Sequence, residues 1–207
     1  VMEQIANLST ETVARVRIPV SPLNNLLTPT NTRGLLFLLN FAIKTDGTLW
    51  VWGYGYLGQL GVNSTANISS PVQTITGGTN WNSVSCGIYF TAAIKTDGTL
   101  WTWGRNSFGQ LGNGNNNNTT PSNYIPAQIG TASNWKTVSA GSNFNIAIKT
   151  DGTLWAWGAN GRGQLGQGNI TDYSSPKQIG ALTAWLKIAT AYGFVFSIKT
   201  DGTLWSW

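Results

Sequence analysis

Four aspartates recur at regular spacing along this 207-residue chain and are its most conspicuous candidate ligands. Asp46, Asp97, Asp151 and Asp201 each stand in the same string, Ile-Lys-Thr-Asp-Gly-Thr-Leu-Trp. Carboxylates bind hard cations, but no second carboxylate lies nearby in the sequence to complete a calcium site. Asp-Gly is also the dipeptide that a tight hairpin turn favours. We therefore interpret these aspartates as turn residues, in a type I′ turn with positive φ at both central positions, and predict no metal site.

Nucleophilic catalysis has few candidate residues here. The chain has no His, the commonest general base and metal ligand. Its single Cys, Cys86, can form no internal disulfide and has no His to activate it, so we interpret it as an inert buried thiol. The Gly-Gln-Leu-Gly stretches lack the Lys-Ser/Thr of a phosphate-binding loop. We predict no catalytic residues, no cofactor, no small-molecule substrate and therefore no enzyme.

Composition excludes further classes of protein. The net charge of +5 reflects few acidic residues, and no run of Lys or Arg marks a nucleic-acid site. No apolar stretch is long enough to span a membrane. Charged residues make up only 9% of the chain, which excludes coiled coils. Low charge with abundant Asn, Thr and Gly favours an extracellular or virion-surface location.

Internal repeats set the organisation of the chain. The lysines of the four strings, Lys44, Lys95, Lys149 and Lys199, are 51, 54 and 50 residues apart. Each string continues to a pair of tryptophans, three continue to Gly-Gln-Leu-Gly, and three follow a further Trp. These features are Trp50/Trp52, Trp101/Trp103, Trp155/Trp157 and Trp205/Trp207; Gly58–Gly61, Gly109–Gly112 and Gly163–Gly166; and Trp81, Trp135 and Trp185.

Each unit has the pattern of short strands. In the second unit we expect strands at 81–85, 90–95 and 99–103, and an edge-like strand that begins at Pro126. Pro71 and Pro176 begin the equivalent strands. Four antiparallel strands in about 50 residues form one blade of a β-propeller, and stacked blades bury each other's faces. The fold class is all-β, a partial propeller of about three to four four-stranded blades. The Trp pairs could form a stacking platform for sugars or bases, but we interpret them as packing between blades.

The organisation follows from these units. Residues 1–34 form a divergent N-terminal segment in which 13–20 is a candidate closing strand and Thr30 takes the position of Trp81. Residues 35–207 form the propeller repeats, in units of about 35–75, 76–129, 130–179 and a truncated 180–207.

The pattern of residues 94–112 and 148–166 resembles the regulator of chromosome condensation repeat, and the resemblance covers about 35–207. The near-identity of the copies is similar to bacterial or viral members. The resemblance implies a propeller, of about seven blades in complete members. Members include an exchange factor for a small nuclear GTPase, a plant ultraviolet photoreceptor and a secreted β-lactamase inhibitor.

This chain departs from the family pattern in two respects. The family commonly has His in the strand before the hairpin, where this chain has Leu39, Phe90, Phe144 and Phe194. The photoreceptor's Gly-Trp-Arg-His-Thr motif is absent, so its light sensing does not carry over. The apolar replacements favour packing over catalysis.

Residues that vary between the copies are the candidate contact residues. The loops after Trp-Gly contain aromatic and Arg side chains of the kind that dominate binding hot spots. The candidate binding residues are Tyr54, Tyr56, Leu57, Arg105, Asn106, Phe108, Asn160 and Arg162. We predict a non-catalytic module that recognises a protein or a surface through these loops. Two alternatives stay open: a structural subunit that self-associates in a larger assembly such as a virion or cell-surface particle, and, by family analogy alone, a regulator of a small GTPase.

Overall fold

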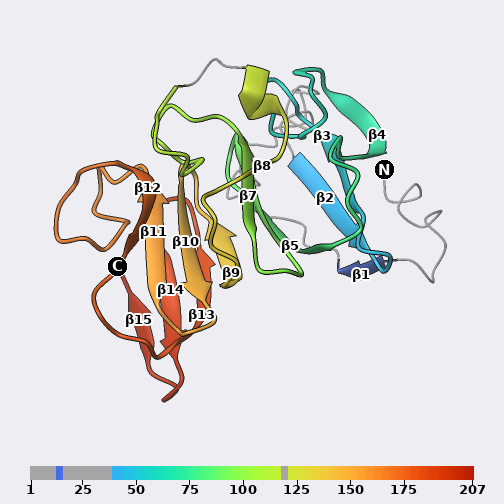
Figure 1. Ribbon diagram of the computed structural model, residues 1–207. Helices are drawn as coiled ribbons and strands as arrows, with labels where there is room; N and C mark the ends of the chain where they lie inside the picture. Colours follow the sequence, from blue (N-terminus) through green and yellow to red (C-terminus); the bar gives the residue numbers. More distant parts are fainter. Residues whose placement is uncertain (1–12, 16–38, 118–120) are drawn as a thin grey trace, which may run out of the picture.

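The computed structural model describes residues 13–15, 39–117 and 121–207, and these form four antiparallel sheets with no α-helix among them (Figure 1). The first sheet contains β1 (Val13–Arg15), β2 (Leu39–Lys44), β3 (Leu49–Gly53) and β4 (Ile68–Gln73). The second contains β5 (Trp81–Cys86), β6 (Phe90–Lys95), β7 (Leu100–Gly104) and β8 (Ala127–Gln128), with a 3-10 turn, η3 (Pro121–Tyr124), before β8. The third contains β9 (Trp135–Ala140), β10 (Phe144–Lys149), β11 (Leu154–Gly158) and β12 (Tyr173–Gln178). The fourth contains β13 (Trp185–Thr190), β14 (Val195–Lys199) and β15 (Leu204–Ser206).

The sheets stand side by side as blades, and the first strands of the later blades contact one another (Figure 1). β9 touches both β5 and β13. The amide of Ala140 donates to Ser85 Oγ at 2.9 Å, and the hydroxyls of Ser139 and Thr190 are 2.8 Å apart. The predicted all-β partial propeller is therefore confirmed, with three four-stranded blades and a fourth of three strands.

The hairpin turn is tight, but it is not the predicted type I′ turn. In the second blade Gly98 N donates to Lys95 O and Lys95 N donates to Thr99 O. Gly98 has a φ of +77°, whereas Asn63 is the one non-glycine residue with positive φ among those described. This is a three-residue loop in which a glycine in the left-handed region completes a G1 bulge. The type I′ prediction was wrong because Asp-Gly satisfies both turns, and Asp97 keeps negative φ.

The described residues form three apolar core clusters, each lying between two neighbouring blades. Between the third and fourth blades, Ile146 and Leu154 of one blade pack with Val195 of the next, and all three side chains are fully buried. Burying one such side chain stabilises the fold by ~1.5–3 kcal/mol. Because each cluster takes side chains from two blades, no blade has a complete core of its own.

The Gly-Gln-Leu-Gly loops join each blade to the next through a tryptophan. The indole Nε1 of Trp103 donates to the carbonyl of Gln59 at 2.9 Å, and Trp157 donates likewise to Gln110 at 3.1 Å. The indole packs so closely on the loop that a Cβ added at Gly61 would lie 2.7 Å from Trp103 Nε1. The interpretation of the second Trp in each pair as interblade packing agrees with this contact.

The fourth strand of each blade differs in its start from the prediction. Pro126, predicted as the first residue of its strand, directly precedes β8, whereas Pro71 and Pro176 lie inside β4 and β12, which begin three residues before them. β4 and β12 are edge strands, where a residue without a backbone N–H can leave its ladder position unpaired. Proline therefore marked the edge strand but not its start.

The first blade takes its first strand from the N-terminal segment. Val13 pairs with Lys44, as Trp81 pairs with Lys95. Val13 therefore has the place that the sequence comparison assigned to Thr30, which lies outside the described residues. Of the candidate closing strand 13–20, residues 13–15 are described, and they pair with β2.

Hairpin turns also dock onto the next unit, and this generates the first prediction. The carbonyl of Gly98 accepts a hydrogen bond from Trp135 N, and a Cβ at Gly98 would collide with the Ser133 carbonyl. Gly202 has a similar φ of +84°, but a Cβ added at this position would have no atom within 4 Å.

Gly202→Ala should lower the free energy of unfolding by about 1–2 kcal/mol, the cost of the left-handed conformation. Gly98→Ala should cost at least about 1 kcal/mol more, because the collision adds to that conformational cost. Urea unfolding monitored by Trp fluorescence measures both. Equal losses at the two positions would contradict docking of the turn.

Candidate functional site

The repeated aspartates cap their own turns. Asp97 Oδ1 accepts hydrogen bonds from Thr99 N at 2.9 Å and Thr99 Oγ1 at 2.7 Å, and Thr99 Oγ1 accepts one from Trp101 Nε1 at 2.8 Å. The same relay occurs at the other three turns. The hydrogen bonds from Thr99 hold the pKa of Asp97 below its usual value. Within the described ranges no three His, Cys, Asp or Glu residues gather as metal ligands.

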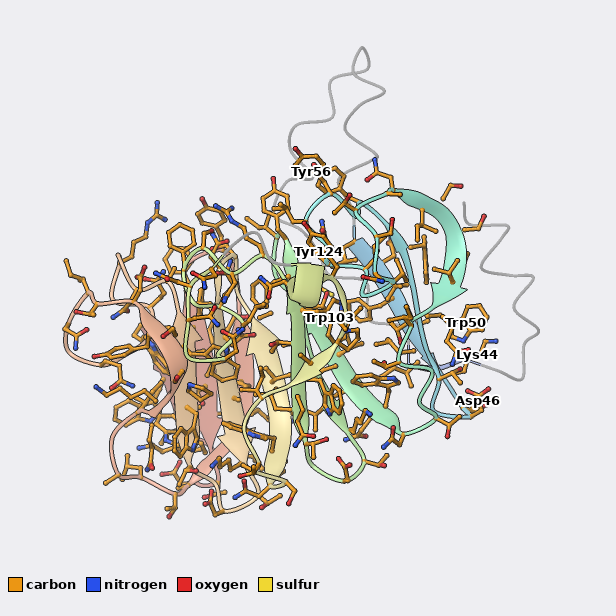
Figure 2. The ribbon with its side chains drawn as sticks, turned by 45° about the horizontal axis from the view of Figure 1, so that its top comes forward. Lys44, Asp46, Trp50, Tyr56, Trp103 and Tyr124 are labelled. Carbon is orange, nitrogen blue, oxygen red and sulfur yellow. The ribbon has the colours of Figure 1, made fainter. Side chains whose placement is uncertain are left out.

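The repeated lysines lie over tryptophan rings at the same end of the blades. Lys95 Nζ is 4.0 Å from the ring centre of Trp101 and 4.9 Å from that of Trp81. Lys44 lies 3.9 Å above Trp50, and Figure 2 shows both near Asp46. The first Trp of each pair therefore supports a lysine cation; Trp50, Trp101 and Trp155 are half-buried, whereas Trp205 is 48% exposed.

The loops at the opposite end of the blades carry an aromatic cluster. The Tyr54 ring centre lies 6.2 Å from that of Tyr56 and 6.1 Å from that of Tyr89. Tyr56 is 64% exposed, and Figure 2 shows it at the end of the molecule opposite Asp46. Partial burial raises the pKa of Tyr54, and the neighbouring Tyr89 and Tyr56 add to this shift.

Arg105 and Phe108 extend this cluster along the rim. The Arg105 guanidinium carbon lies 5.7 Å from the Tyr89 ring centre and 5.4 Å from that of Phe108, and Nε donates to Ser107 Oγ at 2.6 Å. Arg162 lies in the next loop, 5.6 Å from the ring of Tyr192. We name these seven residues the loop rim: Tyr54, Tyr56, Tyr89, Arg105, Phe108, Arg162 and Tyr192.

Asn106 and Asn160 have a different role from their neighbours. Both are fully buried, and their side chains hold their own loops closed. Asn106 Oδ1 accepts from Leu111 N at 3.0 Å and Asn160 Oδ1 accepts from Leu165 N at 2.9 Å. Leu57 is half-buried, and its amide donates to Gln59 Oε1. The structure therefore brings five of the eight candidate residues onto the rim and leaves Asn106, Asn160 and Leu57 as loop framework.

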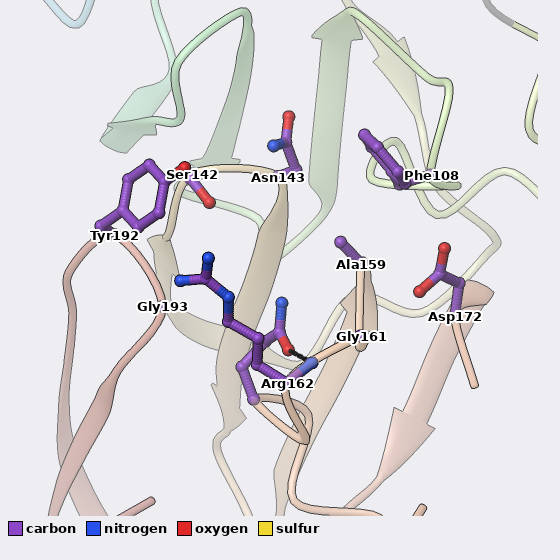
Figure 3. A pocket seen from close by; sticks show the side chains of 10 residues that line it. Phe108, Ser142, Asn143, Ala159, Gly161, Arg162, Asp172, Tyr192 and Gly193 are labelled. Carbon is purple, nitrogen blue, oxygen red and sulfur yellow. Dashed lines mark hydrogen bonds between the residues drawn. The ribbon is translucent and has the colours of Figure 1, made fainter. Parts of the chain in front are cut away.

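A shallow cleft of about 310 Å³ opens on the rim between the third and fourth blades (Figure 3). Phe108, Asn143, Arg162, Asp172 and Tyr192 line it, and Gln164 and four small residues complete the lining. No described residue accepts a hydrogen bond from the Arg162 guanidinium. Asp172 Oδ1 accepts from Asn160 N at 2.7 Å.

The cleft exists because small residues replace large ones in the third loop. Ala159 N donates to Asn143 O as Arg105 N donates to Tyr89 O, so Ala159 and Arg105 are equivalent. Tyr54 has the same place in the first loop, and Gly161 has the place of Tyr56. The small side chains at positions 159 and 161 therefore leave room for the cleft in this loop.

Sequence reasoning missed Tyr89 and Tyr192. Both lie in the short turns before β6 and β14 rather than in the loops after Trp-Gly. The available signal was the variation in the residues before Phe90, Phe144 and Phe194, which read Ile-Tyr, Ser-Asn and Tyr-Gly.

Cys86 takes no part in the rim. Its sulfur lies 3.5 Å from Thr91 Oγ1, and its enclosure raises the pKa of the thiol to about 12. A thiol with this pKa carries almost no thiolate at neutral pH and is a poor nucleophile.

The fold and rim define a class: a repeat propeller with a uniform scaffold and variable loops. The model of the Regulator of chromosome condensation (RCC1) repeat matches residues 46–94, 97–148 and 151–198. The chain belongs to this repeat family. No helix in the described parts of the chain is long and apolar enough to cross a membrane.

Similar proteins include the ultraviolet-B receptor UVR8 of Arabidopsis thaliana, 36% identical over 138 residues, which are 65% of this chain and 30% of the receptor. Human WBSCR16 has a similar structure, with a TM-score of 0.71 and 20% identity over 82% of this chain and 45% of that one. Prp20p of Saccharomyces cerevisiae superposes with a TM-score of 0.69 and 21% identity over 77% of this chain and 41% of its own. The chain thus spans less than half the length of these relatives, and the two structures show the fold.

The turn relays generate a prediction about acid stability. An unfolded Asp has a pKa of about 3.9, and Thr hydrogen bonds lower the pKa of all four turn aspartates in the folded chain. Their contribution is fully present above the unfolded pKa and is lost as pH falls through the lower folded values. The urea midpoint should therefore hold steady from pH 6 to about 4 and then fall.

The matched variant changes all four aspartates to Asn, which keeps an acceptor oxygen and removes the charge. Its midpoint should be lower at pH 6 and nearly independent of pH below 4. The same acid-dependent fall in the variant would assign the effect to the remaining acidic groups.

Proposed function

We propose that this propeller is a non-catalytic protein-recognition module that contacts its partner through the loop rim. The five candidate residues on the rim, Tyr54, Tyr56, Arg105, Phe108 and Arg162, are joined there by Tyr89 and Tyr192. The proposal leaves Asn106, Asn160 and Leu57 as the framework that fixes the loops.

One observation carries the proposal: side chains vary at places where the backbone repeats. Arg105 and Ala159 make the same backbone hydrogen bond from equivalent positions, yet one side chain packs on two aromatic rings and the other opens a cleft. Tyr and Arg are enriched among residues that dominate binding energy. A rigid scaffold that presents such residues on loops is a common way to build a binding surface.

The chemistry of the rim supports recognition rather than catalysis. The described charged groups of the rim and its cleft are Arg105, Arg162 and Asp172, and Asp172 Oδ1 accepts a hydrogen bond from the amide of Asn160. Cys86 is half-buried against the apolar cluster between the first two blades, and burial raises the pKa of its thiol. The relative Prp20p is described as binding Gsp1p and histones, so a protein with this fold takes proteins as ligands.

The test uses a phage-displayed library of random peptides selected on the immobilised chain. Selected peptides should lose at least about tenfold in affinity to the Arg105→Ala, Phe108→Ala double variant, because truncating a hot-spot side chain costs more than about 1 kcal/mol. Ala159→Arg should weaken peptides that occupy the cleft, because it introduces the side chain that the second loop already accommodates. Titration calorimetry measures each affinity.

Lys136→Ala is the matched control. Lys136 is an exposed cation near the start of β9. The residue before it, Trp135, pairs with Lys149 at the hairpin-turn end of the blade, which is the end opposite the rim. Its removal should leave the affinities within about twofold. Peptides equally sensitive to Lys136→Ala, or insensitive to every rim variant, would refute the rim as the contact surface.

A further inference from the structure

The cleft between the third and fourth blades contains a buried amide group that lacks the partner its equivalent has. Gln164 lines the cleft and is 7% exposed, and its Oε1 accepts a hydrogen bond from the amide of Arg162 at 2.9 Å. Its Nε2 donates to no described residue. In the preceding repeat, the equivalent Gln110 Nε2 donates to Asn143 Oδ1 at 3.4 Å. Gly193 takes the place of Asn143 in the fourth blade, so Gln164 has no side chain to bond there.

The glycine at this place is not required by the backbone. Gly193 directly precedes Phe194, as Asn143 precedes Phe144, and the carbonyl of each Phe accepts an amide hydrogen bond from three residues earlier. Gly193 is not among the glycines with positive φ, and a Cβ added there would lie 3.6 Å from Arg162 Nη1, an ordinary contact distance. A side chain would therefore fit, and the effect of the glycine is to leave the glutamine amide open to the cleft.

Two further hydrogen-bond donors line the same cleft. The Arg162 guanidinium packs on the ring of Tyr192, 5.6 Å from its centre, and has no acceptor among the described residues. Asn143 uses its Oδ1 to accept from Gln110, which leaves its Nδ2 as a donor with no acceptor in the described part of the chain. Figure 3 shows Arg162, Tyr192 and Asn143 around one opening. The cleft therefore presents three donors, one of them charged, and none of the three has an acceptor.

Asp172 is the acidic residue of the lining and limits the charge of a ligand. Its Oδ1 accepts from Asn160 N at 2.7 Å, and Figure 3 shows it across the opening from Tyr192. Its negative charge offsets part of the positive charge of Arg162. It therefore disfavours a doubly charged group such as a phosphate more than a singly charged carboxylate.

We propose that this cleft is a carboxylate subsite in which Arg162 and Gln164 hold an acidic group of the bound protein. The inference rests on the proposed recognition function of the loop rim and names the chemistry that the cleft adds to it. A guanidinium pairs with a carboxylate through two parallel hydrogen bonds, which are strong because both groups are charged. A carboxylate oxygen also gives the buried amide of Gln164 the acceptor it lacks. An Asp or Glu side chain and a chain end supply the same group, and different probes distinguish them.

Small probes test the subsite on the whole chain without a protein partner. N-acetylglutamate α-amide carries a side-chain carboxylate, N-acetylalanine carries a chain-end carboxylate, and N-acetylglutamine α-amide is the neutral control. Proton–nitrogen correlation NMR follows the side-chain amide of Gln164 and the Nε–H of Arg162 during titration at constant ionic strength. Acidic probes should shift both signals along one saturable curve, and the neutral probe should shift neither. The acid that binds more tightly identifies the source of the carboxylate.

Gly193→Asn is the most specific variant, because it introduces the side chain that Gln110 already bonds in the preceding repeat. Saturation should then need at least about tenfold more acidic probe, with an unchanged urea midpoint. Arg162→Gln should weaken binding as much, whereas Asp172→Asn should strengthen it. Arg105→Gln is the matched control, since it removes the same charge from the rim outside the cleft lining, and its affinity should stay within about twofold.

Three results would overturn the subsite. They are the absence of a shift with either acid, equal shifts with the neutral probe, and equal losses in Arg105→Gln and Arg162→Gln, which would assign binding to the overall charge of the rim. The proposed function would still stand if phage-selected peptides depend on Arg105 and Phe108. Peptides insensitive to every rim variant would refute that function, and the probes would still report on the cleft.

Discussion

Burial between neighbouring blades is the constraint on which the rest of the structure depends. A sheet of three or four short strands has two faces, and the described blades complete their cores only by sharing three clusters with their neighbours. The Trp indole that donates to a Gln carbonyl of the preceding unit fixes the distance between blades. The requirement for Gly in the loop follows from the same contact, because Trp103 lies where a side chain of residue 61 would be.

This constraint separates residues that must repeat from residues that can vary. The Asp-Thr-Trp relay and the Lys over its Trp ring hold one end of each blade in the same way four times. Loop side chains at the other end touch solvent on one side, so their identity is less constrained by packing. The rim has Tyr, Arg and Ala at one equivalent place, and the shape of the surface follows from that choice.

The repeats made most of the fold predictable from sequence, because four copies show which positions are constant. β6 was predicted at its observed bounds, and the other hairpin strands within a residue. The turn type was not predictable, since Asp-Gly suits both a type I′ turn and a glycine bulge. Strand β1 lacks the Trp that marks its equivalents, so its place is shown only by the pairing of Val13 with Lys44.

At the rim, residue types and variable positions identified Arg105 and Phe108. Asn106 stands in the same variable loop, but its side chain points into the loop, and the direction of a side chain cannot be read from the sequence. Its recurrence as Asn160 was the one signal of a structural role.

Each blade uses one face to receive its predecessor and the other to receive its successor, and this gives the molecule a direction. Interactions run between nearest neighbours, as in a one-dimensional lattice, so total stability is close to a sum over blades and the interfaces between them. Among the described residues, the second and third blades share a cluster with a neighbour on each side and are therefore held on both faces. A substitution in either of these blades should therefore weaken two interfaces at once.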